Sequence, residues 1–243
     1  GCEVENARDA ASFIARARAL GMNVYSNLMK SYAVAPDFFA QQAQLCWEAG
    51  AECIYVVDSA GGMLPHEIAS LASLLRGRIP DVKLGFHGHH NLGMGVANAL
   101  VCADLGFDLI DSSLQGFGRS AGNTPTEQLI AVLLRSGYAV GIDPVDVMQA
   151  SEELVRPLVR ETGISSLDVT AGLALFHSSY MGRVLQIARN HRVDPRRLIL
   201  AVCEHDKARA PADLVEACAR SLSGGAPNYS GRIYHDYFGE EQK

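Results

Sequence analysis

The sequence predicts an α/β fold, with about four strand–helix units around a parallel sheet followed by an all-α extension. Up to about residue 137, short apolar segments of strand length alternate with amphipathic segments of helix length. One strand segment, residues 52–57, is apolar after its first residue, which is typical of a strand buried on both faces of a parallel sheet. Beyond residue 143 only helix-like segments follow.

Local start and stop signals set the expected elements. Gly1 and Cys2 could be the end of an earlier strand, Gly21 stops the first helix, and Pro36 stands in the first turn of the second helix. In chain order we expect helix 5–20, strand 23–29, helix 36–49, strand 52–57, helix 64–75, strand 82–89, helix 93–105, strand 107–114 and helix 124–135. Helices 145–158, 170–190, 195–203 and 212–222 follow.

These elements divide the chain into three parts. Residues 1–140 are predicted to form the domain that contains the sheet and the catalytic site. Residues 141–224 are predicted to form a helical domain for communication or partner binding. The polar and aromatic tail, residues 225–243, is predicted to be mobile.

Composition and charge narrow the class of protein. Of 243 residues, 48% are hydrophobic and 20% are charged, so the chain can bury a core. The net charge of −6, without a dense block of lysine and arginine, argues against a nucleic-acid surface. No apolar run approaches the thickness of a bilayer, and the first residues lack the pattern of a signal peptide. Six scattered cysteines without a C-x-x-C pair are typical of reduced thiols, so we expect a cytoplasmic protein.

Three histidines lie within four residues at the end of the strand predicted over 82–89. Because side chains two apart in a strand point to the same side, His87 and His89 converge while His90 faces away. Two imidazoles on one strand end can occupy adjacent coordination positions of a divalent metal, and Gly88 would leave the space between them open. The alternative is that these histidines line a polar surface, but their clustering at a strand-to-helix junction favours a metal site.

Polar residues also end the other predicted strands. They are Asn27 and Lys30, Asp58 and Ser59, and the segment from Asp111 to Gln115. The carboxyl ends of parallel strands are where α/β proteins place their active sites, so we interpret Asp58 and Ser59 as a site pair rather than a plain turn. Four strands do not close an eight-stranded barrel. Either the sheet is open and doubly wound, or the chain is part of something larger.

A glycine-rich segment from Gly116 to Gly122 follows the last predicted strand and precedes a helix, as phosphate-binding loops do. Its spacing is not G-x-G-x-x-G, and no acidic strand end follows that could bind a ribose. The segment therefore lacks the pattern of a dinucleotide site. Asn123 either caps the next helix, which is the interpretation we prefer, or reaches a metal.

Motifs along nearly the whole chain resemble those of the 4-hydroxy-2-oxovalerate aldolases, which are pyruvate aldolases of the DRE-TIM metallolyase group. The matching segments, in order, are Gly21-Met22-Asn23 with Leu28-Met29, Cys53-Ile54-Tyr55 with Asp58-Ser59, His87-Gly88-His89-His90-Asn91-Leu92-Gly93, Gly95-Val96-Ala97-Asn98, Asp111-Ser112-Ser113-Leu114, Gly116-Phe117-Gly118, Ala121-Gly122-Asn123 and Val155-Arg156-Pro157-Leu158. The resemblance implies that residues 1–140 are the C-terminal part of a TIM (β/α)8 barrel.

The resemblance also implies a site and a partner. In such aldolases the two alternating histidines, here His87 and His89, bind Mn²⁺ or a similar ion such as Mg²⁺ or Co²⁺. A serine at a strand end, here assigned to Ser59, contacts the pyruvate part of the substrate. The helical domain faces a partner, a CoA-dependent acylating aldehyde dehydrogenase, and we expect an oligomer.

The sequence departs from the family pattern in two places. The family has an Arg-Asp-Gly motif whose Asp completes the metal site and whose Arg steadies the enolate; we expect it before residue 1 or on another chain. Arg8-Asp9-Ala10 is only an echo of it, inside a predicted surface helix. Where the family has a Tyr near the substrate's hydroxyl, this chain has His177, which could keep an acid–base or positioning role or be an ordinary helix-surface or interface histidine.

The resemblance, together with the histidine pair at a strand end, implies a metal-dependent aldolase that cleaves a 4-hydroxy-2-oxo acid to pyruvate and an aldehyde. Such an acid can chelate a metal through its carboxylate and 2-oxo oxygen, and the metal stabilises the enolate released when C3–C4 breaks. Lys30 is the only strand-end lysine that could form a Schiff base, and it is not well placed. Two alternatives stay open: a non-catalytic scaffold that docks a partner, and a related metallolyase acting on another 2-oxo acid or an acyl-CoA.

Overall fold

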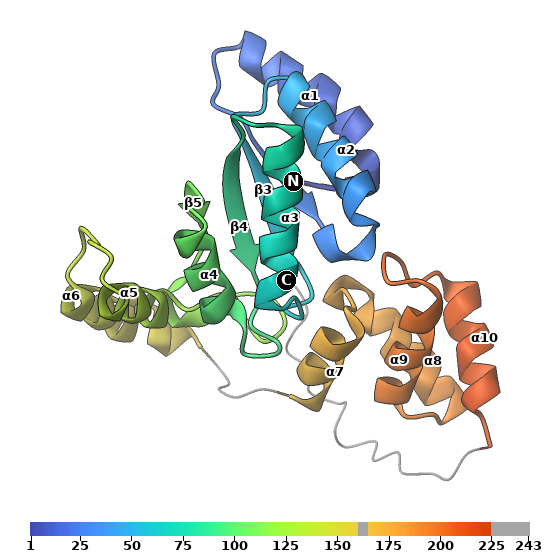
Figure 1. Ribbon diagram of the computed structural model, residues 1–243. Coiled ribbons are helices and arrows are strands. Elements are labelled where there is room, and N and C mark those ends of the chain that lie inside the picture. The colour runs from blue at the N-terminus through green and yellow to red at the C-terminus, as the bar shows by residue number, and fades with distance from the viewer. Residues whose placement is uncertain (160–164, 225–243) are drawn as a thin grey trace.

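The computed structural model describes residues 1–159 and 165–224, and at its centre is a five-stranded parallel sheet (Figure 1). The strands follow one another in chain order across the sheet: β1 (Cys2–Glu3), β2 (Tyr25–Met29), β3 (Cys53–Asp58), β4 (Lys83–Gly88) and β5 (Leu109–Ile110). β1 is the earlier strand that the first residues suggested. Among the described residues β1 and β5 are edges that do not pair with each other, so the sheet is open. The predicted α/β class is confirmed.

Helices cover one face of the sheet. Four of them connect successive strands: α1 (Ala7–Ala19), α2 (Pro36–Glu48), α3 (Pro65–Arg78) and α4 (Gly95–Asp104), with the 3-10 turns η1 (Val4–Asn6) and η2 (Ser31–Ala33). After β5 follow the 3-10 turn η3 (Leu114–Gly116) and α5 (Thr126–Arg135). Pro36 and Pro65 occupy first turns, where a helix has no use for the missing N–H. The core between these helices and the sheet completely buries Leu28, Ile54 and Phe86.

The opposite face of the sheet, here called the inner face, carries the alternate side chains of the strands. Tyr55 and Val57 form a small apolar cluster there, whereas Val56 between them joins the core under the helices. A Cβ on Gly85 would lie 2.5 Å from the Tyr55 ring, so glycine makes room for the tyrosine. His87 stands two residues beyond Gly85 on β4 and therefore lies on the inner face as well.

The rest of the described chain is helical. It contains α6 (Pro144–Ala150), a π-helical turn η4 (Ser151–Val155), η5 (Arg156–Leu158), α7 (Ser166–Ala174), η6 (Ser178–Tyr180), α8 (Met181–His191), α9 (Pro195–His205) and α10 (Ala212–Leu222). The helix expected over 145–158 therefore changes to other helical turns after Ala150.

The single helix expected over 170–190 is wrong. Leu175 has a left-handed backbone conformation, with φ 56°, which ends α7. The N–H of Phe176 then bonds back to the carbonyl oxygen of Ala171 at 2.8 Å, and the Phe176 side chain is buried in the helical core. Burial of an aromatic side chain, at about 1.5–3 kcal/mol, offsets the 1–2 kcal/mol or so that a left-handed residue costs.

Helices α7 to α10, here called the helical unit, form a second hydrophobic core and gather beside the sheet-containing part in Figure 1. Helix α6 and η4 pack instead against α5 and η3; for example, Nε2 of Gln115 donates to Oγ of Ser151 at 2.5 Å. The second core begins at Leu167, and a domain boundary at 140–141 stays a prediction. The tail predicted to be mobile, 225–243, lies outside the described residues.

The helical unit contacts the loops at the carboxyl ends of the strands. A Cβ on Gly62, in the loop after β3, would lie only 2.1 Å from the carbonyl oxygen of Gly172 in α7. Nδ2 of Asn91 donates to the carbonyl oxygen of Asp168 at 3.0 Å, and Oγ of Ser120 donates to the Asp168 carboxylate at 2.9 Å. These contacts hold the helical unit against the edge of the sheet where active sites of parallel α/β proteins lie.

In the described residues, no helix combines the length and apolar character needed to cross a bilayer. All six cysteines are free thiols, as their scattered spacing predicts.

Replacing Gly62 by Ala should lower the free energy of unfolding by about 1–3 kcal/mol, because the new methyl group would overlap the Gly172 carbonyl. Gly77→Ala in α3 is the matched control: nothing lies within 4 Å of its Cβ, so it should be neutral or stabilising by up to about 1 kcal/mol. Urea unfolding of both variants measures the difference. Equal stabilities would show that the helical unit does not approach Gly62 this closely.

Candidate active site

His87 and His89 lie side by side at the carboxyl end of β4. Their ring centroids are 5.4 Å apart and the rings meet edge to face, which is the convergence expected from strand alternation. The role predicted for Gly88 is wrong. A Cβ there would lie 2.5 Å from the Phe86 ring, so this glycine accommodates Phe86 on the helix-covered face and does not open the space between the imidazoles.

A carboxylate orients the first imidazole. Nδ1 of His87 lies 3.0 Å from Oδ2 of Asp111, and the Tyr55 hydroxyl donates to Oδ1 of the same carboxylate at 3.1 Å. Burial and, after it, the charge of Asp111 raise the pKa of Tyr55, so the phenol remains a neutral donor. Histidine–carboxylate pairs fix the ring and its tautomer. Nε2 of His87 is therefore the nitrogen that could bind a metal.

The second imidazole is buried and neutral. Nε2 of His89 lies 2.9 Å from Nη2 of Arg119, and its Nδ1 lies 3.2 Å from the carbonyl oxygen of the same residue. Because a guanidinium only donates and a carbonyl only accepts, we assign the proton to Nδ1 and the acceptor role to Nε2. Burial and then the charge of Arg119 hold the pKa of His89 well below its ordinary value. Neutral imidazole is the form that binds metals.

Sequence reasoning missed Arg119, which lies in the glycine-rich loop between η3 and α5. Its Nη2 also donates to the carbonyl oxygen of Ser59 at 3.0 Å, and its Nη1 donates to Oγ of Ser178. The guanidinium thus joins the end of β3, the His89 ring and the helical unit. The one available signal was its place in a loop that follows a strand end.

Asp58 and Ser59 do different things. Asp58 is fully buried, and its carboxylate accepts the N–H groups of Gly62 at 3.1 Å and Met63 at 2.9 Å. Burial raises the pKa of Asp58 to about 6, an effect that these backbone bonds partly offset. Oγ of Ser59 accepts the N–H of Lys30 at 3.2 Å. Asp58 therefore shapes the loop, whereas the Ser59 hydroxyl still has a proton to donate.

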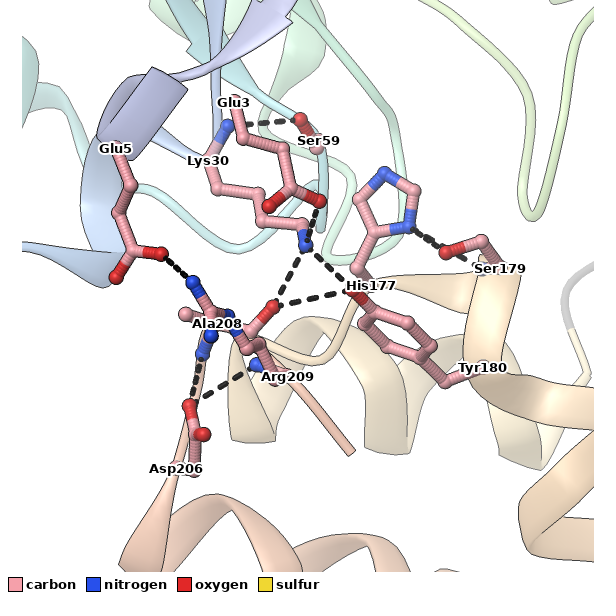
Figure 2. Close-up of polar contacts among 10 residues, drawn as sticks. All are labelled: Glu3, Glu5, Lys30, Ser59, His177, Ser179, Tyr180, Asp206, Ala208 and Arg209. Carbon is pink, nitrogen blue, oxygen red and sulfur yellow. Dashed lines mark hydrogen bonds and ion pairs between the residues drawn. The ribbon is translucent and has the colours of Figure 1, made fainter. Parts of the chain in front are cut away.

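Figure 2 shows the ammonium group of Lys30 between the sheet and the helical unit. It donates to Oε1 of Glu3 at 2.7 Å, to Oη of Tyr180 at 2.8 Å and to the carbonyl oxygen of Ala208 at 2.6 Å. The residue is only 4% exposed. An ammonium has three protons, and here each has an acceptor. Lys30 therefore holds η6, through Tyr180, against the sheet.

His177 lies directly before η6 and is buried, so it is not a helix-surface histidine. Its Nδ1 accepts the N–H of Ser179 at 3.2 Å and lies 2.7 Å from the Ser179 hydroxyl. Nε2 points away from Ser179 in Figure 2, and we assign the proton to it. Burial, followed by the charges of Arg119 and Lys30, lowers the pKa of His177 to about 3. At neutral pH this side chain is a neutral hydrogen-bond donor.

The described residues fit part of a metal site. His87 offers Nε2, whereas Nε2 of His89 becomes a donor only when the Arg119 guanidinium does not occupy it. The buried Oδ1 of Asn123 has no hydrogen-bond partner in the described part of the chain. Nitrogen and amide oxygen donors suit Mn²⁺ and, less well, Mg²⁺. No three side chains of His, Cys, Asp or Glu form a metal-binding group within the described ranges. A carboxylate ligand would have to come from elsewhere.

Asn123 is not the helix cap that we predicted. Helix α5 begins at Thr126, and its N-cap residue is Pro125. Nδ2 of Asn123 donates to the carbonyl oxygen of Phe117 at 3.1 Å instead, so the side chain closes the glycine-rich loop.

A cavity of about 310 Å³ lies elsewhere, beside η3 and η4, and Gln115, Glu127 and Ser151 are among its lining residues. None of the histidines lines it. We place the candidate site at the inner carboxyl edge because the titratable and cationic groups gather there.

A parallel sheet with imidazoles, a carboxylate and cations at its carboxyl edge is the arrangement of an α/β enzyme. The HMGL-like family model matches residues 2–154, and the chain belongs to that family. The chain is similar to the 4-hydroxy-2-oxovalerate aldolase of a Roseiflexus species, with 40% identity over 207 residues, covering 85% of this chain and 61% of the relative. The aldolase of the same name from Shewanella pealeana is 36% identical over 212 residues, covering 86% of this chain and 62% of the relative.

The chain therefore spans about three fifths of the length of these curated relatives. Solved structures share its fold. The carboxyl transferase domain of Rhizobium etli pyruvate carboxylase has a TM-score of 0.69 at 18% identity, covering 91% of this chain and 41% of that one. The N-terminal domain of a Bacteroides vulgatus protein has a TM-score of 0.67 at 25% identity, covering 78% and 63%. Both likenesses agree with the α/β class.

The low pKa of His177 predicts that folding is sensitive to acid. The imidazole titrates near 6.5 in the unfolded chain and near 3 in the folded one. Between these values the unfolded state binds more protons, so stability is fully present above pH 6.5 and is lost as the pH falls. This residue contributes a slope of up to about 1.4 kcal/mol per pH unit.

His177→Gln should remove that part of the slope, measured as the free energy of urea unfolding between about pH 7 and about pH 4.5. His66→Gln, at an exposed position on α3, is the matched control and should keep the slope of the unmodified protein. If both variants keep it, His177 is not buried and neutral as described.

Proposed function

We propose that the full-length protein is a divalent-metal-dependent aldolase, which cleaves a 4-hydroxy-2-oxo acid of the 4-hydroxy-2-oxovalerate type to pyruvate and an aldehyde. Membership of the HMGL-like family and the similarity to the named aldolases support lyase chemistry. The observation that carries the proposal is the pair of converging imidazoles, His87 and His89, at the carboxyl edge of a parallel sheet.

In this proposal His87 and His89 hold Mn²⁺, or Mg²⁺ or Co²⁺ in its place, and Oδ1 of Asn123 is a further donor. A carboxylate ligand is proposed to come from an Arg-Asp-Gly segment, either outside residues 1–243 or on another chain. When bound there, the ion would supply Lewis-acid stabilisation of negative charge on the 2-oxo oxygen. Asp111 keeps the His87 ring in the orientation that binding requires.

Ser59 and His177 are proposed to bind the substrate. The hydroxyl proton of Ser59 suits an oxygen of the pyruvate part. His177, protonated on Nε2, suits the oxygen of the 4-hydroxyl group as a donor. With a pKa near 3, this imidazole is a weak base at neutral pH. Its proposed task is to orient the hydroxyl whose proton another group removes as the C3–C4 bond breaks.

The position of Lys30 argues against an imine mechanism. A Schiff base requires a neutral amine that can approach the carbonyl carbon of the substrate. The Lys30 nitrogen instead donates to a carboxylate, a phenol and a backbone carbonyl, so these contacts would have to break before it could reach a substrate carbonyl. A metal-dependent reaction therefore fits this site better.

The helical unit is the proposed docking surface for a CoA-dependent acylating aldehyde dehydrogenase, within an oligomer. Val169 and Leu173 on α7 leave apolar surface exposed, as a protein-binding surface requires. A non-catalytic scaffold and a metallolyase acting on another 2-oxo acid or an acyl-CoA are the alternatives. Metal content separates the scaffold from the enzyme, and pyruvate release separates the two enzymes.

His87→Ala or His89→Ala in the full-length protein should lower Mn²⁺-stimulated pyruvate release by about 100-fold or more, because each removes a metal ligand. Pyruvate formed from 4-hydroxy-2-oxovalerate is the measurement. His66→Ala, at an exposed position on α3, should have no effect. The 243-residue chain by itself should show little turnover. Strong metal-independent activity of that chain would contradict the mechanism.

His177→Ala should lower kcat or loosen the stereochemistry of aldehyde addition, while Mn²⁺ content stays that of the unmodified enzyme. The reason is that His177 is proposed to contact the substrate's hydroxyl and not the metal. Metal analysis and turnover are measured on the same preparation. A parallel loss of metal and activity would place His177 among the metal ligands instead.

A further inference from the structure

Arg119 lies at the point where the candidate site residues meet. Its guanidinium donates to Nε2 of His89, to the carbonyl oxygen of Ser59 and to Oγ of Ser178, which directly follows His177. The side chain therefore contacts the residue after β3, the residue after β4 and the helical unit. None of the roles in the proposed function uses it.

We propose that Arg119 binds the carboxylate of the 2-oxo acid substrate, and that its guanidinium must leave His89 before a metal ion can bind there. The inference rests on the proposed function, since that function supplies both the carboxylate and the metal. It names Arg119 as a specificity-determining residue of the same site.

The backbone of Arg119 is fixed, so only its side chain is able to move. Its carbonyl oxygen accepts the N–H of Gly122 at 3.0 Å and faces Nδ1 of His89 at 3.2 Å. The next residue, Ser120, has a left-handed backbone with φ 59°, and its hydroxyl is held between Asn91 and the Asp168 carboxylate. The loop thus presents the guanidinium from a defined position.

The imidazole of His89 has one lone pair on Nε2, and Arg119 occupies it in the structure. A nitrogen that accepts an N–H does not coordinate a metal at the same time. A guanidinium stays protonated throughout the physiological pH range. It therefore cannot release the His89 nitrogen by losing a proton. Metal binding to His89 therefore has to displace the guanidinium.

A displaced guanidinium beside a divalent ion needs an anion. Two cations at a few ångströms repel each other strongly in a partly buried site, and a carboxylate between them removes that repulsion. The planar guanidinium group of arginine can also donate two parallel hydrogen bonds to one carboxylate. Lys30, a buried cation nearby, already has an acceptor for each proton. Arg119 is therefore the cation suited to the carboxylate.

The test uses full-length protein and two binding measurements that require no turnover. Mn²⁺ binding is followed by electron paramagnetic resonance of the free ion, without substrate. Pyruvate binding is followed by calorimetry, with and without Mn²⁺. The variants are Arg119→Gln, Arg119→Lys and Arg135→Gln. Arg135 is exposed in the last turn of α5 and is the control for a lost charge.

Arg119→Gln should bind Mn²⁺ about 10-fold more tightly, because a charged competitor for His89 is gone, and pyruvate about 10- to 100-fold more weakly. Arg119→Lys keeps the positive charge but cannot form two parallel hydrogen bonds to a carboxylate. Its pyruvate affinity should therefore fall between those of Arg119→Gln and the unmodified protein. Arg135→Gln should match the unmodified protein in both measurements.

Unchanged affinities in Arg119→Gln would overturn the inference, and so would a parallel loss of both affinities, which marks a structural role. A failure of the proposed function looks different. In that case the unmodified protein would show no His87-dependent Mn²⁺ binding, while pyruvate binding without metal would still decide whether Arg119 recognises a carboxylate.

Discussion

The buried ammonium group of Lys30 is the interaction on which the candidate site depends. A desolvated charge is tolerated only when its hydrogen-bonding protons are satisfied. Here the acceptors come from three separate parts of the chain: Glu3 beside the sheet edge, Tyr180 in η6 and Ala208 after α9. Moving any one of them away would leave a buried charge short of a partner. These contacts therefore fix the position of the helical unit relative to the strand ends.

This position of the helical unit brings His177 and Ser178 to the inner edge of the sheet. Tyr180 is held by Lys30 within the same short turn that follows His177. The loop that carries Arg119 is held from the other side through Ser120 and Asp168. Hydrogen bonds between the two cores thus determine where the polar groups of the site stand, whereas the apolar cores determine only that each part folds.

The electrostatics of the site follow from the same arrangement. Burial comes first among the causes that lower the pKa values of His89 and His177, and the charge of Arg119 comes second for both. Both imidazoles are consequently neutral at physiological pH. Neutral imidazole nitrogens suit a metal ion, and the nearby cation suits an anionic substrate. Neither arrangement suits proton transfer by histidine.

The sequence by itself determined the features that depend on local periodicity. Alternating strand and helix segments predicted the parallel sheet, and the spacing of His87 and His89 predicted that their rings converge, because side chains on a strand alternate with period two. Motifs spread along the chain also pointed to the family. None of these inferences required contacts between distant residues.

Only the tertiary structure decided the features that depend on contacts between distant segments. Leu175 ends α7 with a left-handed backbone because burying Phe176 outweighs the free-energy cost of that conformation. The position has no glycine that would have predicted the end of the helix. Asn123 closes a loop instead of capping α5, and Gly88 leaves room for the Phe86 ring. Lys30 and Arg119 look like ordinary strand-end and loop cations in the sequence. Their roles come from acceptors tens to more than a hundred residues away, which no local pattern encodes.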